Sequence, residues 1–359
     1  AERDRSLHLP YQAYHPFINL LNEAAADPAV TAIKMTQYRV AAHSRIVSAL
    51  INAANNGKAV TVFVEVKARF DEAANLYWAE EMQRAGVNII YSMPGLKVHA
   101  KLALVKREEA GQERRYAFLS TGNFNEKTAR LYADHGIFTA EPTLTGEVDR
   151  LFEYLAGREP EPRFEHLLVA QFNLRERFLA LIDREIAAAK RGEPAWMIVK
   201  VNNLEEKTMI AKLYEAVEAG VEIDLIVRSI CCLVPEPHPN LRVRRIVGRF
   251  LEHARVFVFH NGGQREMYLA SADWMTRNLH KRIESGFPVQ DSAIEEEIMA
   301  ILDLQLRDNT KAVCLDAQLT NHFVERSPGE APVRAQLDTY ELVKAWVERE
   351  QTKLSILSS

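Results

Sequence analysis

Alternating helices and strands are predicted by the pattern of apolar and polar residues along the first half of the chain. Amphipathic spacing and turn signals such as Asn56-Gly57 indicate helices over residues 14–26, 45–55 and 71–85. Short runs of β-branched and other apolar residues indicate strands over residues 30–38, 60–66 and 87–91. This βαβαβ order predicts an α/β fold in which a mainly parallel sheet is flanked by helices.

The same succession begins again after residues 157–162, a proline-rich stretch that would break a helix. A long helix is expected over residues 172–190, and strands are expected over residues 197–201, 221–227 and 241–246. For a chain of 359 residues, a typical domain length of about 150 residues favours two domains. We therefore predict two domains of similar topology, over residues 1–160 and 161–359.

A final helix is expected over residues 332–351, inside the second predicted domain. Its apolar stripe consists of Val333, Leu337, Tyr340, Val343 and Trp346. The stripe predicts that the helix docks on its own domain, with a partner chain as the alternative.

One histidine motif occurs in each predicted domain. In the first, His99-Ala100-Lys101 leads to a small-residue turn at residues 120–123, and in the second, His253-Ala254-Arg255 leads to a similar turn at residues 270–273. Apolar residues alternate with the polar ones, so each motif is expected in a strand with imidazole and cation on one face. A single histidine in a strand is more often structural than catalytic. Two such units, however, would present a nucleophile and an acid to one phosphorus atom.

Composition narrows the classes of function. The net charge of −4 argues against a protein that binds a polyanion with its whole surface, so local basic residues would have to hold one. Three cysteines give no disulfide framework and no metal-ligand spacing, which fits a reducing compartment. No apolar run in the sequence approaches the ~18 residues of a membrane span. We expect a cytoplasmic protein without an integral membrane segment, and peripheral association with a membrane stays open.

Longer stretches around the motifs carry a family resemblance. Residues 38–40, 68–75, 95–101 and 121–132 closely resemble the polyphosphate kinases, and residues 225–228, 252–253 and 271–278 agree with them in the second half. The histidine units also resemble those of the phospholipase D superfamily, although Lys106 stands where that pattern has an aspartate. The resemblance implies two phospholipase D-like domains and reversible transfer of the terminal phosphate of ATP to inorganic polyphosphate. A phospholipase D-like phosphodiesterase and a noncatalytic polyphosphate- or nucleotide-binding module are the alternatives.

The resemblance implies a role for each histidine. His99 matches the histidine that becomes phosphorylated, and His253 matches the second active-site histidine, a candidate general acid or base. A neutral imidazole nitrogen can attack phosphorus without first losing a proton, which suits the nucleophile's role. Ala254 stands where an acidic residue is expected in many relatives. Any group that orients His253 must then lie elsewhere.

Phosphate and nucleotide contacts are implied by the same resemblance. Arg39 and Arg69 match arginines at the phosphates and their Mg²⁺, and Tyr132 and Arg228 match nucleotide-contacting positions. Guanidinium forks bind phosphate oxygens bidentately but cannot ligate a cation, so the Mg²⁺ is expected on the phosphates, without an assigned protein ligand. Ion pairs for the arginines and core packing for the tyrosine remain open as alternatives.

Two further residues join the phosphate site on their chemistry. Lys101 would place a point charge beside His99, with a solvent-facing lysine as the alternative. Asn123 and Glu126 are typical of the N-cap and capping-box partner of a helix that would continue through Leu131. The backbone amides at the start of such a helix would also bind a phosphate.

The expected partners follow from the family as well. They are ATP or ADP and inorganic polyphosphate, with no nucleic acid, and the family implies a homo-oligomer. The chain begins with Ala1 rather than Met, and the relatives are longer. We therefore expect this chain to be the C-terminal catalytic half of a protein whose N-terminal domains are missing here.

Overall fold

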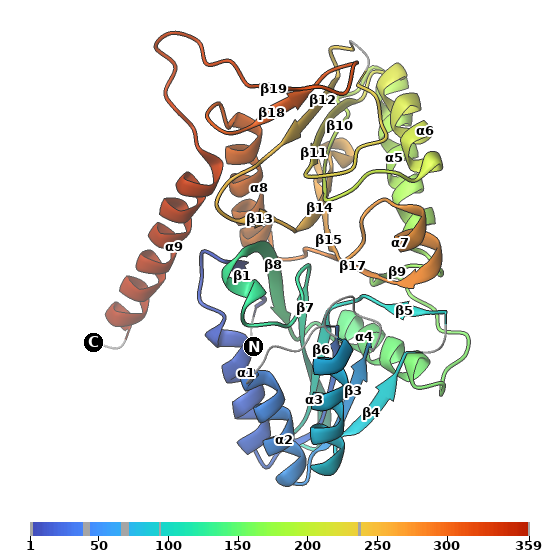
Figure 1. Ribbon diagram of the computed structural model, residues 1–359, viewed down its shortest axis with the longest axis vertical. Helices are drawn as coiled ribbons and strands as arrows, with labels where there is room; N and C mark the ends of the chain where they lie inside the picture. The colour runs from blue at the N-terminus through green and yellow to red at the C-terminus, as the bar shows by residue number, and fades with distance from the viewer. Residues whose placement is uncertain (1–2, 39–43, 66–71, 93–94, 236–237, 358–359) are drawn as a thin grey trace.

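The computed structural model describes residues 3–38, 44–65, 72–92, 95–235 and 238–357. Arg39 and Arg69, which are predicted to bind phosphates, lie outside these ranges. The described chain folds into two α/β domains stacked one on the other, and a long C-terminal helix extends from the second domain toward the first (Figure 1).

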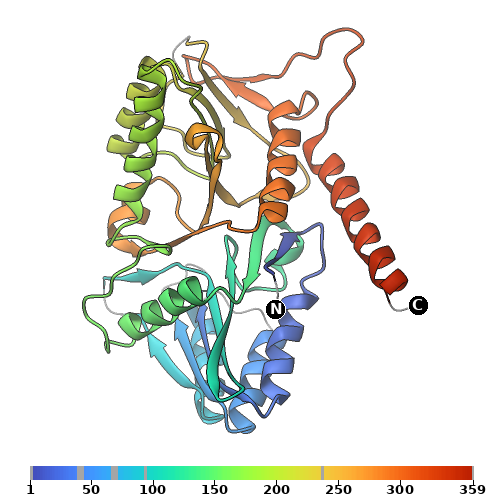
Figure 2. The same cartoon turned by 180° about the vertical axis from the view of Figure 1, so that it is seen from behind.

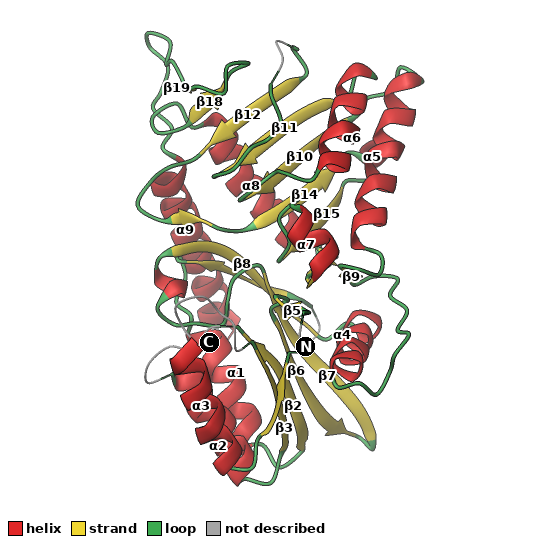
Figure 3. Cartoon of the chain, turned by 45° about the vertical axis from the view of Figure 1, so that its right-hand side comes forward, coloured by secondary structure: helices red, strands yellow, loops and turns green. Residues whose placement is uncertain are grey.

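The first domain is built around a sheet with the strand order β1-β8-β7-β6-β2-β3-β4. Its strands are β1 (Arg5–Leu9), β2 (Val30–Gln37), β3 (Ala59–Val64), β4 (Asn88–Tyr91), β6 (Leu102–Glu109), β7 (Gln112–Ser120) and β8 (Tyr132–Thr139). The helices are α1 (His15–Ala26), α2 (Arg45–Asn55), α3 (Glu72–Arg84) and α4 (Pro142–Leu155). Helices α1 to α3 cover the face that presents Met35, and α4 covers the face that presents Leu104 (Figure 3).

The second domain has a sheet with the order β19-β18-β12-β11-β10-β14-β15-β17-β9. Its strands are β9 (Leu168–Val169), β10 (Trp196–Val201), β11 (Glu222–Val227), β12 (Leu241–Arg245), β14 (Arg255–Phe259), β15 (Glu266–Ala270), β17 (Ser285–Pro288), β18 (Val313–Leu315) and β19 (Asn321–Phe323). The helices are α5 (Leu174–Lys190), α6 (Lys207–Glu218), α7 (Thr276–Lys281), α8 (Ser292–Arg307) and α9 (Ala335–Leu357). Helices α5 and α6 cover one face of the sheet and α8 the other (Figure 2).

The two sheets share one strand order in their central part. β17-β15-β14-β10-β11-β12 in the second domain corresponds to β8-β7-β6-β2-β3-β4 in the first. The predicted α/β class and the duplication are therefore confirmed. The boundary between the predicted domains, at residues 160 and 161, stays a prediction.

The expectation of mainly parallel sheets is wrong. β2 pairs with β3 and β3 with β4 in parallel, as the βαβαβ pattern predicts, but β6 runs antiparallel to β2, and β7 and β8 continue antiparallel. The second sheet repeats this, because β14 is antiparallel to β10 and β15 to β14. A parallel neighbour needs a crossover helix, whereas β6, β7 and β8 follow each other without one and form hairpins.

The C-terminal helix buries only part of the predicted apolar stripe: Val343 is buried as predicted, but Leu337 and Tyr340 are not. Leu337 and Tyr340 are half exposed, at 51% and 49%, whereas Gln336, Thr339 and Val343 are buried. Gln336 turns inward because its amide hydrogen-bonds the backbone of residue 250 and the carboxylate of residue 252. The helix contacts α8 of its own domain, as expected, and it also reaches the first domain, where the Trp346 ring lies 5.9 Å from the His8 ring.

The domain junction is formed by two short strand pairs and one continuous core. β5 (Lys97–Val98) pairs in parallel with β16 (Arg282–Ile283), and β13 (Leu251–Glu252) pairs in parallel with β8. Apolar side chains of α4 and α8 belong to the same buried cluster. Strands of each domain are thus bonded to the other, which fixes the histidine motifs that follow β5 and β13. Within the described part of the chain, no helix has both the length and the apolar character of a membrane span.

Candidate active site

The first histidine lies at the domain junction, directly after β5. Residues 99–101 belong to neither β5 nor β6, so the continuous strand predicted through His99 is wrong. The backbone N–H groups of His99 and Ala100 both donate to the carbonyl oxygen of Ile283, at 2.8 and 3.0 Å. A single carbonyl of the second domain therefore positions the backbone of the first motif.

The imidazole of His99 is oriented by a buried carboxylate of the second domain. Its Nδ1 lies 2.8 Å from Oε2 of Glu284. The same carboxylate accepts a hydrogen bond from the Ser271 hydroxyl at Oε2 and one from the Asn278 amide at Oε1. Burial lowers the pKa of His99 to about 3, although Glu284 opposes this shift. The ring is therefore neutral near pH 7, and an Nδ1–H that donates to the carboxylate leaves the lone pair on Nε2.

The second histidine repeats this arrangement with the domains exchanged. The backbone N–H groups of His253 and Ala254 donate to the carbonyl oxygen of Ala133, at 3.1 and 2.8 Å. Its Nδ1 lies 2.9 Å from both carboxylate oxygens of Asp134, a residue of β8, and Thr121 donates to the same carboxylate at 2.6 Å. Burial lowers the pKa of His253, and Asp134 opposes this shift. Each domain thus supplies the carboxylate that orients the histidine of the other.

The cation of each motif lies at its histidine. Lys101 is buried, donates to the carbonyl oxygen of His99 and lies 5.6 Å from the centre of the Tyr38 ring. Arg255 is also buried, and its Nη1 lies 3.2 Å from Nε2 of His253. The alternative of a solvent-facing Lys101 is wrong, because its side chain is buried.

The nucleotide-contacting residues implied by the resemblance lie beside the second histidine. The Tyr132 ring is 5.1 Å from the His253 ring, and Nη1 of Arg228 donates to the carbonyl oxygen of Glu252 at 2.8 Å. Burial lowers the pKa of Arg228, with a further contribution from Arg255. Aromatic and guanidinium groups therefore meet at the imidazole of His253, and their contact with a nucleotide stays a prediction.

Comparison with known proteins identifies the chain's relatives. The family model described as polyphosphate kinase C-terminal domain 1 matches residues 1–161, and that of polyphosphate kinase C-terminal domain 2 matches residues 167–336. The polyphosphate kinase of Escherichia coli K12 is 45% identical over 347 residues, which are 96% of this chain and 50% of the relative. The chain belongs to the polyphosphate kinase family. The polyphosphate kinase of Halalkalibacterium halodurans is likewise 45% identical over 97% of this chain and 50% of its own length.

Solved structures agree with this assignment. The crystal structure of polyphosphate kinase from Porphyromonas gingivalis has a TM-score of 0.91 and 51% identity, and the match covers 97% of this chain and 53% of that one. Phosphatidylserine synthase from Haemophilus influenzae has a TM-score of 0.61 at 12% identity, which shows a shared fold alone. The two-domain α/β architecture of this chain is thus shared with both structures. The chain spans about half the length of the curated polyphosphate kinases it matches.

The helix expected after Asn123 is absent from the described structure. Residues 123–127 form no helix, and only one short 3₁₀ turn follows, η1 (Thr128–Arg130). Glu126 instead accepts hydrogen bonds from the backbone N–H of Arg45 at 2.7 Å and from the hydroxyl of Ser44 at 3.1 Å, at the start of α2. The capping box was therefore the wrong interpretation, because the carboxylate caps a helix that lies far back in the sequence.

The side chain of Asn123, in the turn after β7, lacks the partner that a capping role would give it. Its side-chain Oδ1 is buried, and no group of the described residues hydrogen-bonds it. A phosphate site at a helix N-terminus is thus excluded here, but the side-chain amide of Asn123 is left available for a ligand.

The sequence did not predict the two carboxylates that orient the histidines. Glu284 is 185 residues from its histidine and Asp134 is 119 residues from its own, and no local pattern connects such pairs. One signal does exist: each carboxylate lies 13 residues after the hydroxyl that donates to it, Thr121 in one copy and Ser271 in the other.

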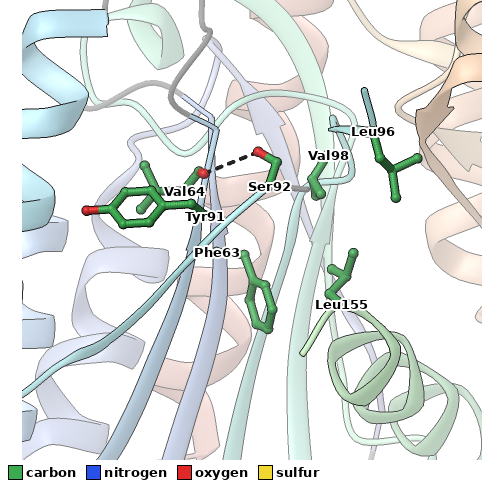
Figure 4. A pocket seen from close by; sticks show the side chains of 7 residues that line it. All are labelled: Phe63, Val64, Tyr91, Ser92, Leu96, Val98 and Leu155. Carbon is green, nitrogen blue, oxygen red and sulfur yellow. Dashed lines mark hydrogen bonds between the residues drawn. The ribbon is translucent and has the colours of Figure 1, made fainter. Parts of the chain in front are cut away.

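A small apolar pocket adjoins the first motif but does not contain the site. Figure 4 shows its lining, which consists of Phe63, Val64, Tyr91, Ser92, Leu96, Val98 and Leu155. The Ser92 hydroxyl donates to the carbonyl oxygen of Val64 at 3.3 Å, the bond drawn in Figure 4, and to the carboxylate of Glu65 at 2.9 Å. Neither histidine of the two motifs and no lysine or arginine lines this pocket.

Proposed function

We propose that this chain carries the catalytic centre of a polyphosphate kinase, which transfers the terminal phosphate of ATP reversibly to inorganic polyphosphate through a phosphohistidine on His99. The observation that carries the proposal is the pair of buried, neutral imidazoles, each oriented by a carboxylate of the opposite domain. Relatives that share 45% identity over nearly the whole chain support the phosphotransferase class.

His99 is the nucleophile in this proposal. Its Nε2 lone pair attacks the terminal phosphorus of ATP, the N–P bond forms, and the P–O bond to ADP breaks with its electron pair on the departing oxygen. The phosphorylated ring keeps its Nδ1–H and becomes cationic, so the Glu284 carboxylate at 2.8 Å stabilises it. A terminal oxygen of polyphosphate then attacks the phosphorus, and the neutral imidazole is restored.

In this proposal His253 exchanges a proton with the departing and attacking oxygens. Its Nδ1–H is directed to Asp134, so proton exchange falls to Nε2, which accepts a hydrogen bond from Arg255 at 3.2 Å. Nε2 must exchange this bond for a substrate oxygen before it accepts a proton in one direction or donates one in the other. Binding of a polyanion beside the ring favours the protonated form, which opposes the burial that lowers its pKa. The ring thereby supplies a proton when negative charge develops on the leaving oxygen.

Basic and polar side chains neutralise the phosphoryl oxygens. Lys101 and the Asn123 amide act at His99, and Tyr132 and Arg228 contact the nucleotide beside His253. Arg39 and Arg69 keep the roles that the resemblance gives them, with Mg²⁺ carried on the phosphates. No group of three or more acidic, histidine or cysteine side chains suited to a metal occurs among the described residues. Glu284 and Asp134 already hydrogen-bond the two histidines, and Asp273 pairs with Arg255.

Partners and location remain part of the proposal. We expect the N-terminal domains of the longer relatives to complete the nucleotide site, copies of the protein to form a homo-oligomer, and the enzyme to act in the cytoplasm. The relatives' length supports the first expectation, since this chain spans half of it.

Incubation with γ-labelled ATP and Mg²⁺ tests the proposal. The protein should acquire acid-labile, alkali-stable label, His99→Gln should acquire none, and His322→Gln should be labelled normally because His322 is exposed on β19. Thermal unfolding of both variants controls for loss of folding. Label that persists in His99→Gln would overturn the assignment, and release of alcohol from a phosphodiester without any label would favour the phosphodiesterase alternative.

A further inference from the structure

The two histidine motifs occupy equivalent places in their sheets, so their residues can be compared position by position. Arg255 in β14 is paired with Ala270 in β15. In the first domain, the backbone N–H of Ser120 donates to the carbonyl oxygen of Lys101 at 3.1 Å, which places these two residues opposite each other in the same way. Ser120 and Ala270 are therefore equivalent positions at the ends of their strands. The residue three positions later is Asn123 in the first copy and Asp273 in the second.

In the second copy the carboxylate neutralises the cation. Oδ1 of Asp273 lies 3.1 Å from Nε of Arg255 and accepts the backbone N–H of Asn202 at 2.8 Å. Burial acts to raise the pKa of Asp273, but Arg255 and the hydrogen bonds lower it to about 2, so the pair is ionic. The guanidinium held in this way also donates from Nη1 to Nε2 of His253 at 3.2 Å, which occupies the lone pair of that ring.

In the first copy the cation has no such counter-ion. Lys101 is 1% exposed, and no described carboxylate forms an ion pair with it. Burial lowers the pKa of Lys101, and the charges of Glu284 and Asp134 oppose this shift from a distance and favour the ammonium form, as an incoming phosphate would. The buried Oδ1 of Asn123 has no hydrogen-bond partner among the described groups. Nε2 of His99 likewise has no hydrogen bond from any described residue, in contrast to Nε2 of His253.

We propose that the amide of Asn123 and the carboxylate of Asp273 decide which histidine accepts the phosphoryl group. A neutral side chain at position 123 leaves the charge of Lys101 for the phosphoryl oxygens, beside a lone pair that is free to attack. The carboxylate of Asp273 holds Arg255 in an ion pair, and Arg255 in turn donates a hydrogen bond to Nε2 of His253, so that lone pair is not free to attack. The inference deepens the proposed function, since it explains why phosphate is received by one of two similar rings.

The chemical step differs between the copies only in this charge balance. At His99 the N–P bond forms and the P–O bond to ADP breaks, while the oxygens of the transferred group gain negative charge beside Lys101. A carboxylate at position 123 would repel these oxygens and hold the ammonium group away from them. The side chains of asparagine and aspartate have nearly the same size, so exchange between them changes charge rather than packing.

Rapid-quench labelling with γ-labelled ATP and Mg²⁺ tests position 123. Asn123→Asp should label His99 roughly tenfold more slowly than Asn123→Leu does at pH 8, and this gap should narrow as the pH is lowered and the introduced carboxyl is protonated. Equal rates for the two variants at all pH values would show that the amide matters only as a hydrogen-bonding group, and that would overturn the inference.

Position 273 is tested in a protein that lacks the first nucleophile. His99→Gln should be unlabelled, whereas His99→Gln combined with Asp273→Asn should acquire label that peptide mapping places on His253. Failure of the combined variant to label, with its unfolding temperature unchanged, would also overturn the inference. If the unaltered protein is not labelled on His99, the proposed function itself fails, so the two failures are distinguished by the parent protein.

Discussion

Nδ1 of His99 lies 2.8 Å from Oε2 of Glu284, a carboxylate that the chain supplies 185 residues later from the other domain. His253 has the reciprocal relationship with Asp134, which precedes it by 119 residues. Neither imidazole is oriented by its own domain, so the reactive geometry exists only when the two domains are joined. The continuous apolar core beneath the junction, which includes side chains of α4 and α8, holds them in this register.

Glu284→Gln should abolish rapid phosphorylation of His99 while leaving the fold intact. The replaced group has the same shape, but its amide can donate to Nδ1 and thereby select the tautomer whose proton sits on Nε2, where the nucleophilic lone pair is required. Loss of an orienting carboxylate lowers activity by roughly 10²- to 10⁴-fold. Single-turnover labelling measures the rate. The exposed Glu215 of α6 provides the control, and Glu284→Gln labelling as fast as Glu215→Gln would contradict the prediction.

The elements that the sequence predicts well are those with a local periodic pattern. The amphipathic run over residues 45–55 gives α2 with the same ends, and α1 and α3 begin and end within one residue of their predicted bounds, whereas α4 was not predicted. The duplication is also visible in the sequence, because both copies pass through the same order of helix, strand and histidine. These features depend on neighbours in the chain, which a sequence displays directly.

The features that the sequence does not predict are decided by distant partners. Glu126 has the spacing of a capping box, yet its carboxylate caps α2 through Arg45, 81 residues away. The strand through His99 is interrupted because its N–H bonds a carbonyl of the other domain instead of a neighbouring strand of its own sheet. Periodicity describes which face is apolar, but it contains no information about which distant group occupies the polar face.

Gly122→Ala should reduce transfer activity through Asp134. A Cβ at position 122 would overlap the carboxylate of Asp134, which holds Nδ1 of His253. The displaced carboxylate no longer orients the ring, and we expect activity to fall by roughly 10- to 100-fold. Steady-state transfer from ATP to polyphosphate measures the effect.

The matched control for this change is Gly146→Ala in α4, where the added methyl group has room. It should retain activity and raise the free energy of unfolding by about 0.5–1 kcal/mol, since alanine favours a helix over glycine. Equal activity of the two alanine variants would show that the position of Asp134 does not matter for transfer.

Gln336→Ala should impair the second histidine from a distance. The amide accepts the backbone N–H of Phe250 at 3.0 Å, donates to its carbonyl oxygen at 2.9 Å, and donates to Glu252 at 2.7 Å, directly before His253. Loss of these bonds leaves buried polar groups without partners, which costs about 1–3 kcal/mol of unfolding free energy. We also expect kcat to fall several-fold, with KM for ATP changed less.

Denaturant titration and steady-state kinetics check both expectations for α9. Leu337→Ala is the control, because Leu337 is the next residue of the helix and is half exposed, so its loss should change neither quantity appreciably. A kcat of the Gln336→Ala variant that equals the parent value would show that α9 contributes stability alone and does not align His253.

Acidification should destabilise the protein in a pH range that identifies the buried histidines. Burial lowers the pKa of His99 to about 3, and burial also lowers the pKa values of His253 and His135, the latter with its Nδ1 2.9 Å from Nδ1 of His8. In the unfolded chain each ring has a pKa near 6.5, so below that pH the unfolded state binds more protons than the folded state. The free energy of unfolding is therefore highest above pH 6.5 and falls as the pH is lowered toward 4.5.

Each such ring contributes up to about 1.4 kcal/mol per pH unit within that range. Carboxylates with lowered pKa values also reduce the free energy of unfolding on acidification, but at lower pH. The pKa of Asp273 is about 2, so its contribution is lost only below a pH of about 4. Urea titrations from pH 7.5 to 4.5 separate the two groups. His99→Gln should reduce the slope between pH 6.5 and 4.5 by close to one proton. Curves that run parallel for this variant and the parent protein would mean that folding does not lower the pKa of His99, which would contradict burial of the ring in its neutral form.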